Sequence, residues 1–219
     1  MHFEILVEDQ SGEKALDILI PKIVGNAHSF KIHGYKGLGH FRKNLKANAD
    51  PSKRHLLNLL PGLLRGYGKT HASYSPDFPA AVILVCDLDN RNLKSFLEEL
   101  HSVLETCNPK PETRFCIAIE EGEAWFLGDI PAIKKAYPKA NNVILNKYVN
   151  DSICGTWEQL ADAIYPGGSQ ELSAQGRPRV GAEKSEWSIK ITPHMDVENN
   201  KSQSFCNFRQ ALKELAKIV

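Results

Sequence analysis

Three short apolar runs rich in β-forming residues place the strongest constraint on what this chain can fold into. They cover residues 3–7, 81–86 and 114–119, and a weaker alternating run covers residues 29–33. Continuous apolar character without alternation is typical of strands in a parallel sheet that helices cover on both faces. Because helical patterns separate these runs, the sequence predicts an α/β fold, with a mostly parallel sheet flanked by helices.

Helical patterns fill most of the remaining chain. In the first half they cover residues 11–24, 56–64 and 93–104. Ser11 is the expected N-cap of the first of these helices, and Pro21 is expected to bend or end it. The later patterns cover residues 130–137, 156–164, 182–191 and 204–219, and an exposed loop is expected over the Gly- and Pro-rich residues 165–179.

This change of pattern divides the chain into two parts. We predict an α/β domain over residues 1–135 and a mainly helical C-terminal extension over residues 136–219 that packs on it. A length of 219 residues is enough for one sizeable core with such an extension.

The composition excludes several classes of protein. Lys and Arg number 27 against 26 Asp and Glu, so nucleic acid is not attracted to the molecule as a whole, and a polyanion site must be local. No apolar run approaches the roughly 20 residues that span a bilayer, and the protein is expected to be cytoplasmic with no membrane partner. Five cysteines without a Cys-x-x-Cys pair do not predict a disulfide framework or a zinc ribbon. The oligomeric state stays open, and a homo-oligomer is compatible with the sequence.

Acidic residues follow each of the three strong strand predictions. The acids are Glu8 and Asp9 after the first run, Asp87 and Asp89 after the second, and Glu120, Glu121 and Glu123 after the third. If the strands are parallel neighbours, these carboxylates meet at one edge of the sheet, where α/β proteins commonly bind ligands. Carboxylates that crowd together repel each other, and a divalent cation relieves that repulsion. Because the set is rich in oxygen ligands, Mg²⁺ or Mn²⁺ is the expected ion.

The spacing suggests which acids share an ion. Asp87 and Asp89 point the same way if their strand continues, and together with Glu8 they supply three ligands. Glu120, Glu121 or Glu123 could serve a second ion. The alternative for any one of these acids is that it caps a helix or faces solvent.

These residues resemble the Toprim fold, which topoisomerases, primases and nucleases of the overcoming-lysogenisation-defect type share. That family has a glutamate in a short polar turn after its first strand, as at Leu6-Val7-Glu8-Asp9, and a later strand that ends in Asp-x-Asp, as at Asp87-Leu88-Asp89. Residues 117–129 contain Glu-Ala-Trp-Phe-Leu-Gly-Asp, which resembles a signature of small stand-alone Toprim-like proteins. The chain departs from the family pattern at Asp9, where glycine is usual, and at Gly12, where the nuclease branch often has an acid.

The resemblance implies a function and a set of roles. It implies that Glu8, Asp87 and Asp89 bind Mg²⁺ and that Glu8 takes part in proton transfer. We select Glu123 as a further acid of the site. A metal site of this kind suits a nuclease that hydrolyses phosphodiester bonds of DNA or RNA. Because related proteins are often encoded beside an ABC-type ATPase in phage-defence operons, an ATPase partner that controls the activity is expected.

Basic residues outside the acidic cluster add candidate contacts. Lys36, His40, Arg42 and Lys43 lie in a locally positive stretch that could follow a phosphate backbone, unless it is simply a solvated loop. Lys184 lies at the start of a predicted helix, where the helix dipole disfavours a cation, so a role in stabilising transition-state charge is suggested beside that of an ordinary surface lysine. Residues 62–69 superficially resemble a phosphate-binding loop, but they are expected to end a helix rather than follow a strand.

Two other hypotheses compete with the nuclease. In the first, the domain is a non-catalytic binding or assembly module, which is favoured if Glu8, Asp87 and Asp89 cannot reach one ion or if a basic side chain neutralises the cluster. In the second, Asp87 is the nucleophile of a phosphatase or phosphotransferase, although the downstream Ser/Thr and Lys set of such enzymes is not evident.

Overall fold

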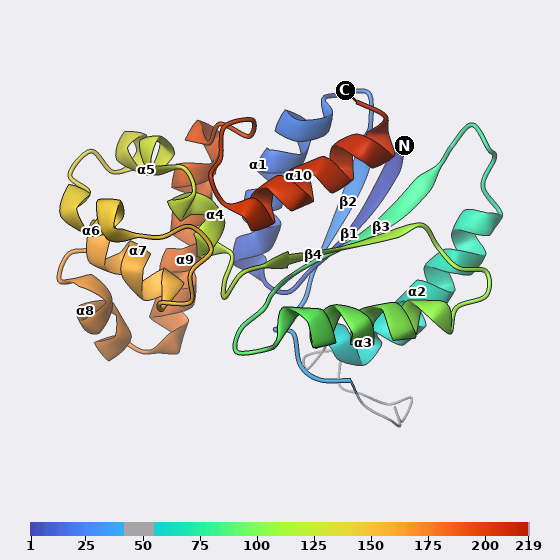
Figure 1. The fold of residues 1–219 in the computed structure, drawn as a ribbon, viewed down its shortest axis with the longest axis horizontal. Coiled ribbons are helices and arrows are strands. Elements are labelled where there is room, and N and C mark those ends of the chain that lie inside the picture. The colour runs from blue at the N-terminus through green and yellow to red at the C-terminus, as the bar shows by residue number, and fades with distance from the viewer. Residues whose placement is uncertain (42–54, 219) are drawn as a thin grey trace.

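A four-stranded parallel sheet lies between helices in the computed structural model, which describes residues 1–41 and 55–218 (Figure 1). The strands are β1 (His2–Val7), β2 (Ser29–Gly34), β3 (Ala80–Asp87) and β4 (Thr113–Ala118). Their order is β2-β1-β3-β4, and every neighbouring pair is parallel. The predicted α/β class, with a parallel sheet flanked by helices, is therefore confirmed, and the predicted strands differ from the observed ones by at most one residue at either end.

Alternate side chains of the strands enter two separate cores. Phe3, Ile5 and Val7 of β1 face the larger core, which includes side chains of α1 (Gln10–Val24), α9 (Arg177–Ile191) and α10 (Gln203–Ala216). Leu6 of β1 faces the smaller core, which α2 (Leu56–Ala72) and α3 (Leu93–Glu105) cover. Because apolar side chains occupy both faces, the central strands read as continuous apolar runs.

The first helix differs from its prediction at its start, and it ends at Val24 as predicted. It begins at Gln10, and its N-cap is Asp9 rather than Ser11, because the Asp9 carboxylate accepts a hydrogen bond of 2.7 Å from the backbone N–H of Gly12. Pro21 lies inside the helix, which continues to Val24. Since Pro21 falls in the last turn, the helix loses only one hydrogen bond close to where it would end in any case.

The second helix is twice as long as predicted. It covers Leu56–Ala72, so residues 62–69 are helical throughout rather than the end of a helix, and the resemblance to a phosphate-binding loop has no structural basis. Packing explains the glycine at position 68 of this helix. A Cβ on Gly68 would lie 2.0 Å from the carbonyl oxygen of Pro109, so only glycine allows the helix to approach that loop so closely.

Helices make up the second half of the described chain. The helices not yet given are α4 (Glu123–Leu127), α5 (Ile130–Ala136), α6 (Asn142–Lys147), α7 (Thr156–Ile164) and α8 (Gly168–Ala174), with a 3-10 turn η2 (Thr192–His194) before α10. The exposed loop predicted over residues 165–179 is wrong, because it contains α8 and the first turn of α9. Helix α9 begins five residues before its predicted start, with Pro178 in its first turn, a position that suits proline.

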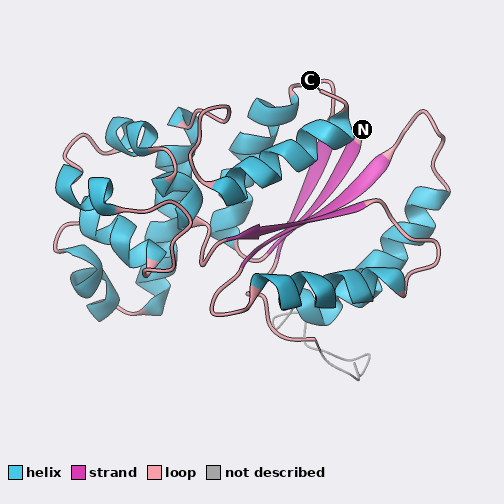
Figure 2. Cartoon of the chain, in the orientation of Figure 1, coloured by secondary structure: helices cyan, strands magenta, loops and turns pink. Residues whose placement is uncertain are grey.

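The C-terminal helices position the site at one edge of the sheet. The strands run toward the group formed by α4 to α9 (Figure 2). Trp187 of α9 and Phe208 of α10 share the larger core with Phe3 and Trp125, so residues of both predicted parts pack together. The boundary at residues 135 and 136 itself stays a prediction. Within residues 1–41 and 55–218, no helix combines the length and apolar character needed to cross a membrane.

Candidate functional site

The carboxyl ends of β1, β3 and β4 meet at one edge of the sheet, as the parallel arrangement requires. Val7 of β1 pairs with Val85 of β3, and Asp87 at the end of β3 pairs with Ala118 at the end of β4. Glu8 follows β1 directly, so its backbone lies beside the last residues of β3. The acids that follow these strands are therefore gathered at one edge, as the sequence predicted.

Glu8 is in direct contact with the end of β3. The backbone N–H of Asp87 donates a hydrogen bond of 3.2 Å to Oε2 of Glu8. The pKa of Glu8 is raised to about 7, chiefly by burial and also by the charges of Asp89 and Asp9, while the backbone amides of Asp87 and Leu38 act in the opposite direction. Glu8 can therefore hold or release a proton near neutral pH.

Asp87 is the most strongly perturbed acid of the site. Burial raises the pKa of Asp87 well above its usual range, and the charges of Glu8, Glu123 and Asp9 add to this effect, while the charge of Lys184 lowers it. The charge of Glu8 thus disfavours ionisation of Asp87, and the charges of Asp89 and Asp9 disfavour ionisation of Glu8. A neighbouring positive charge would stabilise the ionised forms of both carboxylates.

Lys184 supplies a positive charge from the C-terminal helices. Its Nζ lies 3.1 Å from Glu123 and 3.7 Å from Glu121, and the Glu123 side chain is only 4% exposed. Burial opposes the charge of Lys184, but Glu123, Glu121 and Asp87 together raise the pKa of Lys184 above its usual range, so the amine stays protonated. Burial also raises the pKa of Glu121 to about 7, against the effect of Lys184.

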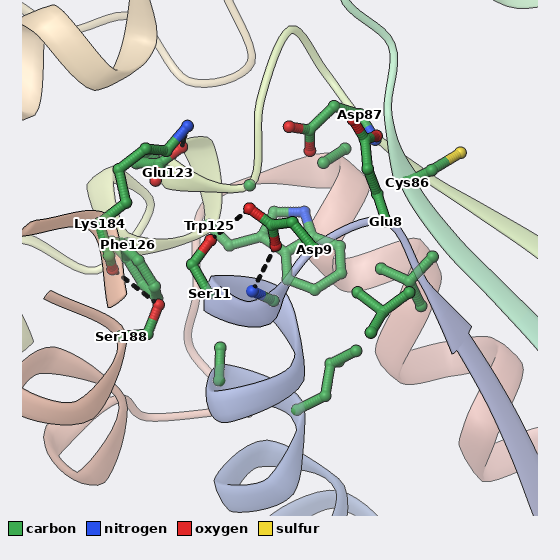
Figure 3. A pocket seen from close by; sticks show the side chains of 17 residues that line it. Glu8, Asp9, Ser11, Cys86, Asp87, Glu123, Trp125, Phe126, Lys184 and Ser188 are labelled. Atoms are coloured by element: carbon green, nitrogen blue, oxygen red, sulfur yellow. Dashed lines mark hydrogen bonds and ion pairs between the residues drawn. The ribbon is translucent and has the colours of Figure 1, made fainter. Parts of the chain in front are cut away.

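A small cavity of about 50 Å³ lies between these groups (Figure 3). Glu8 and Asp87 lie on one side of it, and Glu123 and Lys184 lie on the other. Its apolar walls come from β1, β3, α1 and α4, and include Val7, Leu16, Val85, Trp125 and Phe126. Carboxylates and one lysine therefore surround a cavity with largely apolar walls, where electrostatic interactions are stronger than in water.

Glu120, which the sequence indicated as a possible metal ligand, does not line this cavity. Its backbone has a φ of 60°, and its carboxylate accepts hydrogen bonds from the backbone N–H groups of Cys154, Gly155 and Thr156 at 2.9–3.1 Å and from the Thr156 hydroxyl. Although burial acts to raise the pKa of Glu120, these hydrogen bonds lower it below its usual range. Glu120 caps the N-terminus of α7, which was the stated alternative for a single acid.

Replacing Glu120 with alanine is therefore expected to destabilise the fold without affecting the site. The free energy of unfolding should fall by about 2 kcal/mol, because several donors at the start of α7 lose their acceptor. Urea denaturation of the variant would measure this loss, with Glu99→Ala, which removes an exposed acid of α3, as the matched control. Unchanged stability would show that the cap is not needed.

Asp89 also departs from its predicted position. Asp87 and Asp89 were expected to point the same way if their strand continues, and this condition is not met, because β3 ends at Asp87 and Asp89 has a φ of 50°. The Asp89 side chain is 50% exposed, and its Oδ2 lies 2.9 Å from the Nη1 of Arg91. Its charge still acts on Glu8. Asp89 therefore lies beside the cluster, with Arg91 as its partner.

The described acids do not form a ready-made set of three ligands. Within residues 1–41 and 55–218, no group of three or more His, Cys, Asp or Glu side chains has an arrangement that could hold a metal ion. The predicted triad of Glu8, Asp87 and Asp89 is thus not assembled around a single point as the side chains stand. Glu8 and Asp87 are the two that the fold brings together.

The segment after β2 lies directly against Glu8. The backbone N–H of Gly37 donates to the carbonyl oxygen of Glu8 at 2.9 Å, and that of Tyr35 donates to Val7 at 3.0 Å. Lys36 and His40 in this segment are exposed, so two of the predicted nucleic-acid contacts border the site. The other two, Arg42 and Lys43, lie outside the described residues.

The Glu-Ala-Trp-Phe-Leu-Gly-Asp motif joins the site to the C-terminal helices. Trp125 stacks on Phe208 with ring centroids 5.0 Å apart, and its Nε1 donates to the Ser204 hydroxyl at 3.0 Å. A Cβ on Gly128 would lie 2.2 Å from Oδ1 of Asn200, so this glycine allows a close approach. Within the motif, Glu123 alone lines the cavity with a charged side chain, and the other residues mainly fix the helices in place.

Sequence reasoning selected Lys184 for the wrong reason and missed one residue. Lys184 is the eighth residue of α9 rather than a residue of its first turn, so the dipole argument does not apply. The missed residue is Arg91, which contacts both Asp89 and the carbonyl oxygen of Gly39. A cation two residues after the second acid of Asp-x-Asp was the only signal that could have indicated it.

Comparisons with known proteins give a family but not an activity. No curated protein and no solved structure matches the chain. One family model, described as a domain of unknown function (DUF4276), matches residues 7–215 and therefore includes Glu8, Asp87, Glu123 and Lys184. Because the model spans nearly all of the chain, this protein belongs to the DUF4276 family.

Proposed function

We propose that this protein is a metal-dependent nuclease that hydrolyses phosphodiester bonds of DNA or RNA at the cavity between Glu8, Asp87, Glu123 and Lys184. The proposal rests mainly on the contact between the Glu8 carboxylate, directly after β1, and the backbone N–H of Asp87 at the end of β3, because burial and neighbouring carboxylates raise the pKa of both acids. Strongly perturbed acids that line a cavity are typical of functional sites. The resemblance to Toprim nucleases assigns the same two residues to the metal.

The residues present fit Mg²⁺ or Mn²⁺. Mg²⁺ usually binds one or two protein carboxylates and completes its shell with waters and substrate phosphates, so Glu8 and Asp87 are a sufficient protein contribution. Both side chains offer only oxygen atoms, which these ions prefer. A bound Mg²⁺ would supply positive charge beside the phosphate and make a neighbouring water more acidic.

The side chains have distinct roles in the proposed hydrolysis. The oxygen of a water bonds to phosphorus, the bond from phosphorus to the leaving sugar oxygen breaks, and that oxygen takes up a proton. Glu8, with a pKa of about 7, can accept the proton that the water loses. Lys184 stays protonated and can stabilise the negative charge that grows on the phosphate, while Glu123 and Glu121 hold its amine in place.

The non-catalytic module remains the second candidate because two observations favour it. Lys184 already neutralises part of the cluster through Glu123 and Glu121. Asp89 is paired with Arg91 instead of facing Glu8 and Asp87. In this alternative, the acids and Lys184 stabilise the junction between the sheet and the C-terminal helices, and the domain serves assembly.

The wider setting is part of the proposal. We expect the nuclease to act in the cytoplasm as the effector of an anti-phage or DNA-processing system, together with an ABC-type ATPase that controls it. This expectation is supported by the resemblance of residues 117–129 to small stand-alone Toprim-like proteins. An uncontrolled nuclease would damage its host, so low activity in isolation is expected.

A cleavage assay tests the proposal. The purified protein would be incubated with plasmid, linear and single-stranded DNA and with RNA, in Mg²⁺, Mn²⁺ or EDTA, alone and with any ATPase encoded beside it. Cleavage that requires the metal supports the nuclease. If no substrate is cut under any condition, including with the ATPase, the nuclease proposal fails and the module is favoured.

Lys184→Met is expected to lower the cleavage rate about 100-fold, the usual effect of removing one preorganised positive or hydrogen-bonding group. Loss of its charge also raises the pKa of Asp87 and Glu121, which Lys184 lowers. The pH below which activity declines should therefore move upward. A pH–rate profile checks this, with Lys190→Met, a change in the same helix at an exposed position, as the control. A lower rate with an unmoved profile would contradict the electrostatic role.

A further inference from the structure

Arg91 connects three features at the rim of the proposed site. Its Nη1 lies 2.9 Å from Oδ2 of Asp89, and its Nη2 donates to the carbonyl oxygen of Gly39 at 3.3 Å. Its guanidinium carbon lies 5.1 Å from the centre of the Phe96 ring. The guanidinium is thus held in place by Gly39 and Phe96 independently of Asp89.

In contrast to the guanidinium of Arg91, the side chain of Asp89 is not held in place by any described residue other than Arg91, and only its backbone is fixed further. Its N–H donates to the carbonyl oxygen of Glu120 at 3.0 Å, which keeps the residue at the same edge of the sheet as Glu8 and Asp87. Its side chain is half exposed, and the carboxylate has Arg91 as its ion-pair partner. An ion pair this exposed contributes little to stability, so a stronger partner can replace the arginine.

We infer that Arg91 exchanges partners during the proposed reaction: a divalent cation draws the Asp89 carboxylate toward Glu8 and Asp87, and the freed guanidinium binds a phosphate oxygen of the substrate. The inference rests on the proposed function. It explains how Asp89 can belong to a metal site and yet be paired with an arginine. A guanidinium that is already fixed beside the cluster suits a phosphate, because its planar donors match phosphate oxygens.

The exchange predicts opposite effects for one substitution. Arg91→Gln should strengthen Mn²⁺ binding about threefold, because the competitor for Asp89 and a nearby positive charge are both removed. The same change should weaken binding of a fluorescein-labelled oligonucleotide in Ca²⁺, and reduce the slope of log affinity against log salt by about one. A residue that merely supported the local fold would weaken both kinds of binding.

Two further variants make the test specific. Arg114 also pairs with an acid two residues away, Glu112, and the exposure of this ion pair is similar. Arg114 is the second residue of β4, at the end of the strand opposite the site, so Arg114→Gln is the matched control. Asp89→Asn removes the carboxylate for which Arg91 and the cation compete. In the Asp89→Asn background, Arg91→Gln should strengthen Mn²⁺ binding less than it does in the wild type, because only the loss of the nearby positive charge remains.

Mn²⁺ binding would be followed by electron paramagnetic resonance, and oligonucleotide binding by fluorescence anisotropy. Tighter Mn²⁺ binding and weaker oligonucleotide binding in Arg91→Gln, with Arg114→Gln unchanged, support the exchange. If the wild type binds Mn²⁺ and Asp87→Asn does not, the assay reports the proposed metal site. Unchanged or weaker Mn²⁺ binding in Arg91→Gln then overturns the exchange of partners. If the wild type and Asp87→Asn both fail to bind Mn²⁺, the proposed metal site itself fails, and the exchange fails with it.

Discussion

Replacing Asp87 with asparagine is expected to reduce metal-dependent cleavage of nucleic acid by at least about 100-fold. Changes that only surround a metal ligand lower activity or affinity 10- to 100-fold, and Asp87 is a proposed ligand itself. Asparagine retains the volume of the side chain, and the backbone N–H that holds Glu8 is unaffected. The loss should therefore come from the missing charge and not from a changed fold. Initial rates over a range of Mg²⁺ concentrations measure it.

The controls separate a loss of chemistry from a loss of structure. Asp77→Asn removes an exposed acid just before β3, at the opposite end of that strand, and should cleave like the wild type. Circular dichroism and urea denaturation should show Asp87→Asn to be folded and at least as stable as the wild type, because burial opposes ionisation of Asp87. The double variant Asp87→Ala, Asp89→Ala should be inactive. Cleavage by Asp87→Asn at the wild-type rate would place the active centre elsewhere.

The strands and the meeting of their acids could be predicted because both follow from general rules. Apolar runs such as residues 81–86 must be buried on both faces, and parallel neighbours bring their carboxyl ends to one edge whatever their order. Glu8 and Asp87 needed nothing more than these rules. For this reason the fold class and the central pair of the candidate site were accessible without any structure.

The positions of the acids that lie two residues after the ends of β3 and β4 could not be predicted in this way. Asp89 and Glu120 both adopt positive φ values, so the chain turns at each of them and the alternation of a strand no longer applies. The partners of Glu120 are backbone amides of residues 154–156, more than thirty residues away along the chain. Local sequence patterns cannot predict a contact between such distant residues. The position of Lys184 could not be predicted from them either, because it depends on how α9 packs on α1.

Helix α2 illustrates a different limit of the sequence. Pro61, Gly62 and Gly66 lower the local preference for a helix, and the predicted helix covered only residues 56–64. Tertiary packing reverses that preference, since Leu56, Leu60 and Leu64 are fully buried against the sheet and Gly68 lies against Pro109. Packing of an apolar face commonly outweighs such propensities.

Replacing Glu8 with glutamine is expected to stabilise the protein at alkaline pH while it removes the proposed activity. The pKa of Glu8 is raised from 4.5 to about 7 in the folded state, so the folded protein holds this proton more tightly than the unfolded chain does. Below pH 4.5 both states are protonated, and the carboxyl does not oppose folding. As the pH rises toward 7 the unfolded chain ionises first, and the free energy of unfolding declines.

Above about pH 7 the folded wild type carries the full cost of this buried charge, whereas Glu8→Gln does not. The variant should therefore exceed the wild type in free energy of unfolding by about 3 kcal/mol at alkaline pH, and the difference should vanish below pH 4.5. Urea denaturation at several pH values measures it, with the exposed acid change Glu105→Gln as the control. Saturating Mg²⁺ should stabilise the wild type more than Glu8→Gln, because the cation offsets the charge that the variant lacks. A difference between variant and wild type that does not depend on pH would show that burial of the Glu8 charge is not what limits stability, and it would remove the main physical argument for a cation at this site.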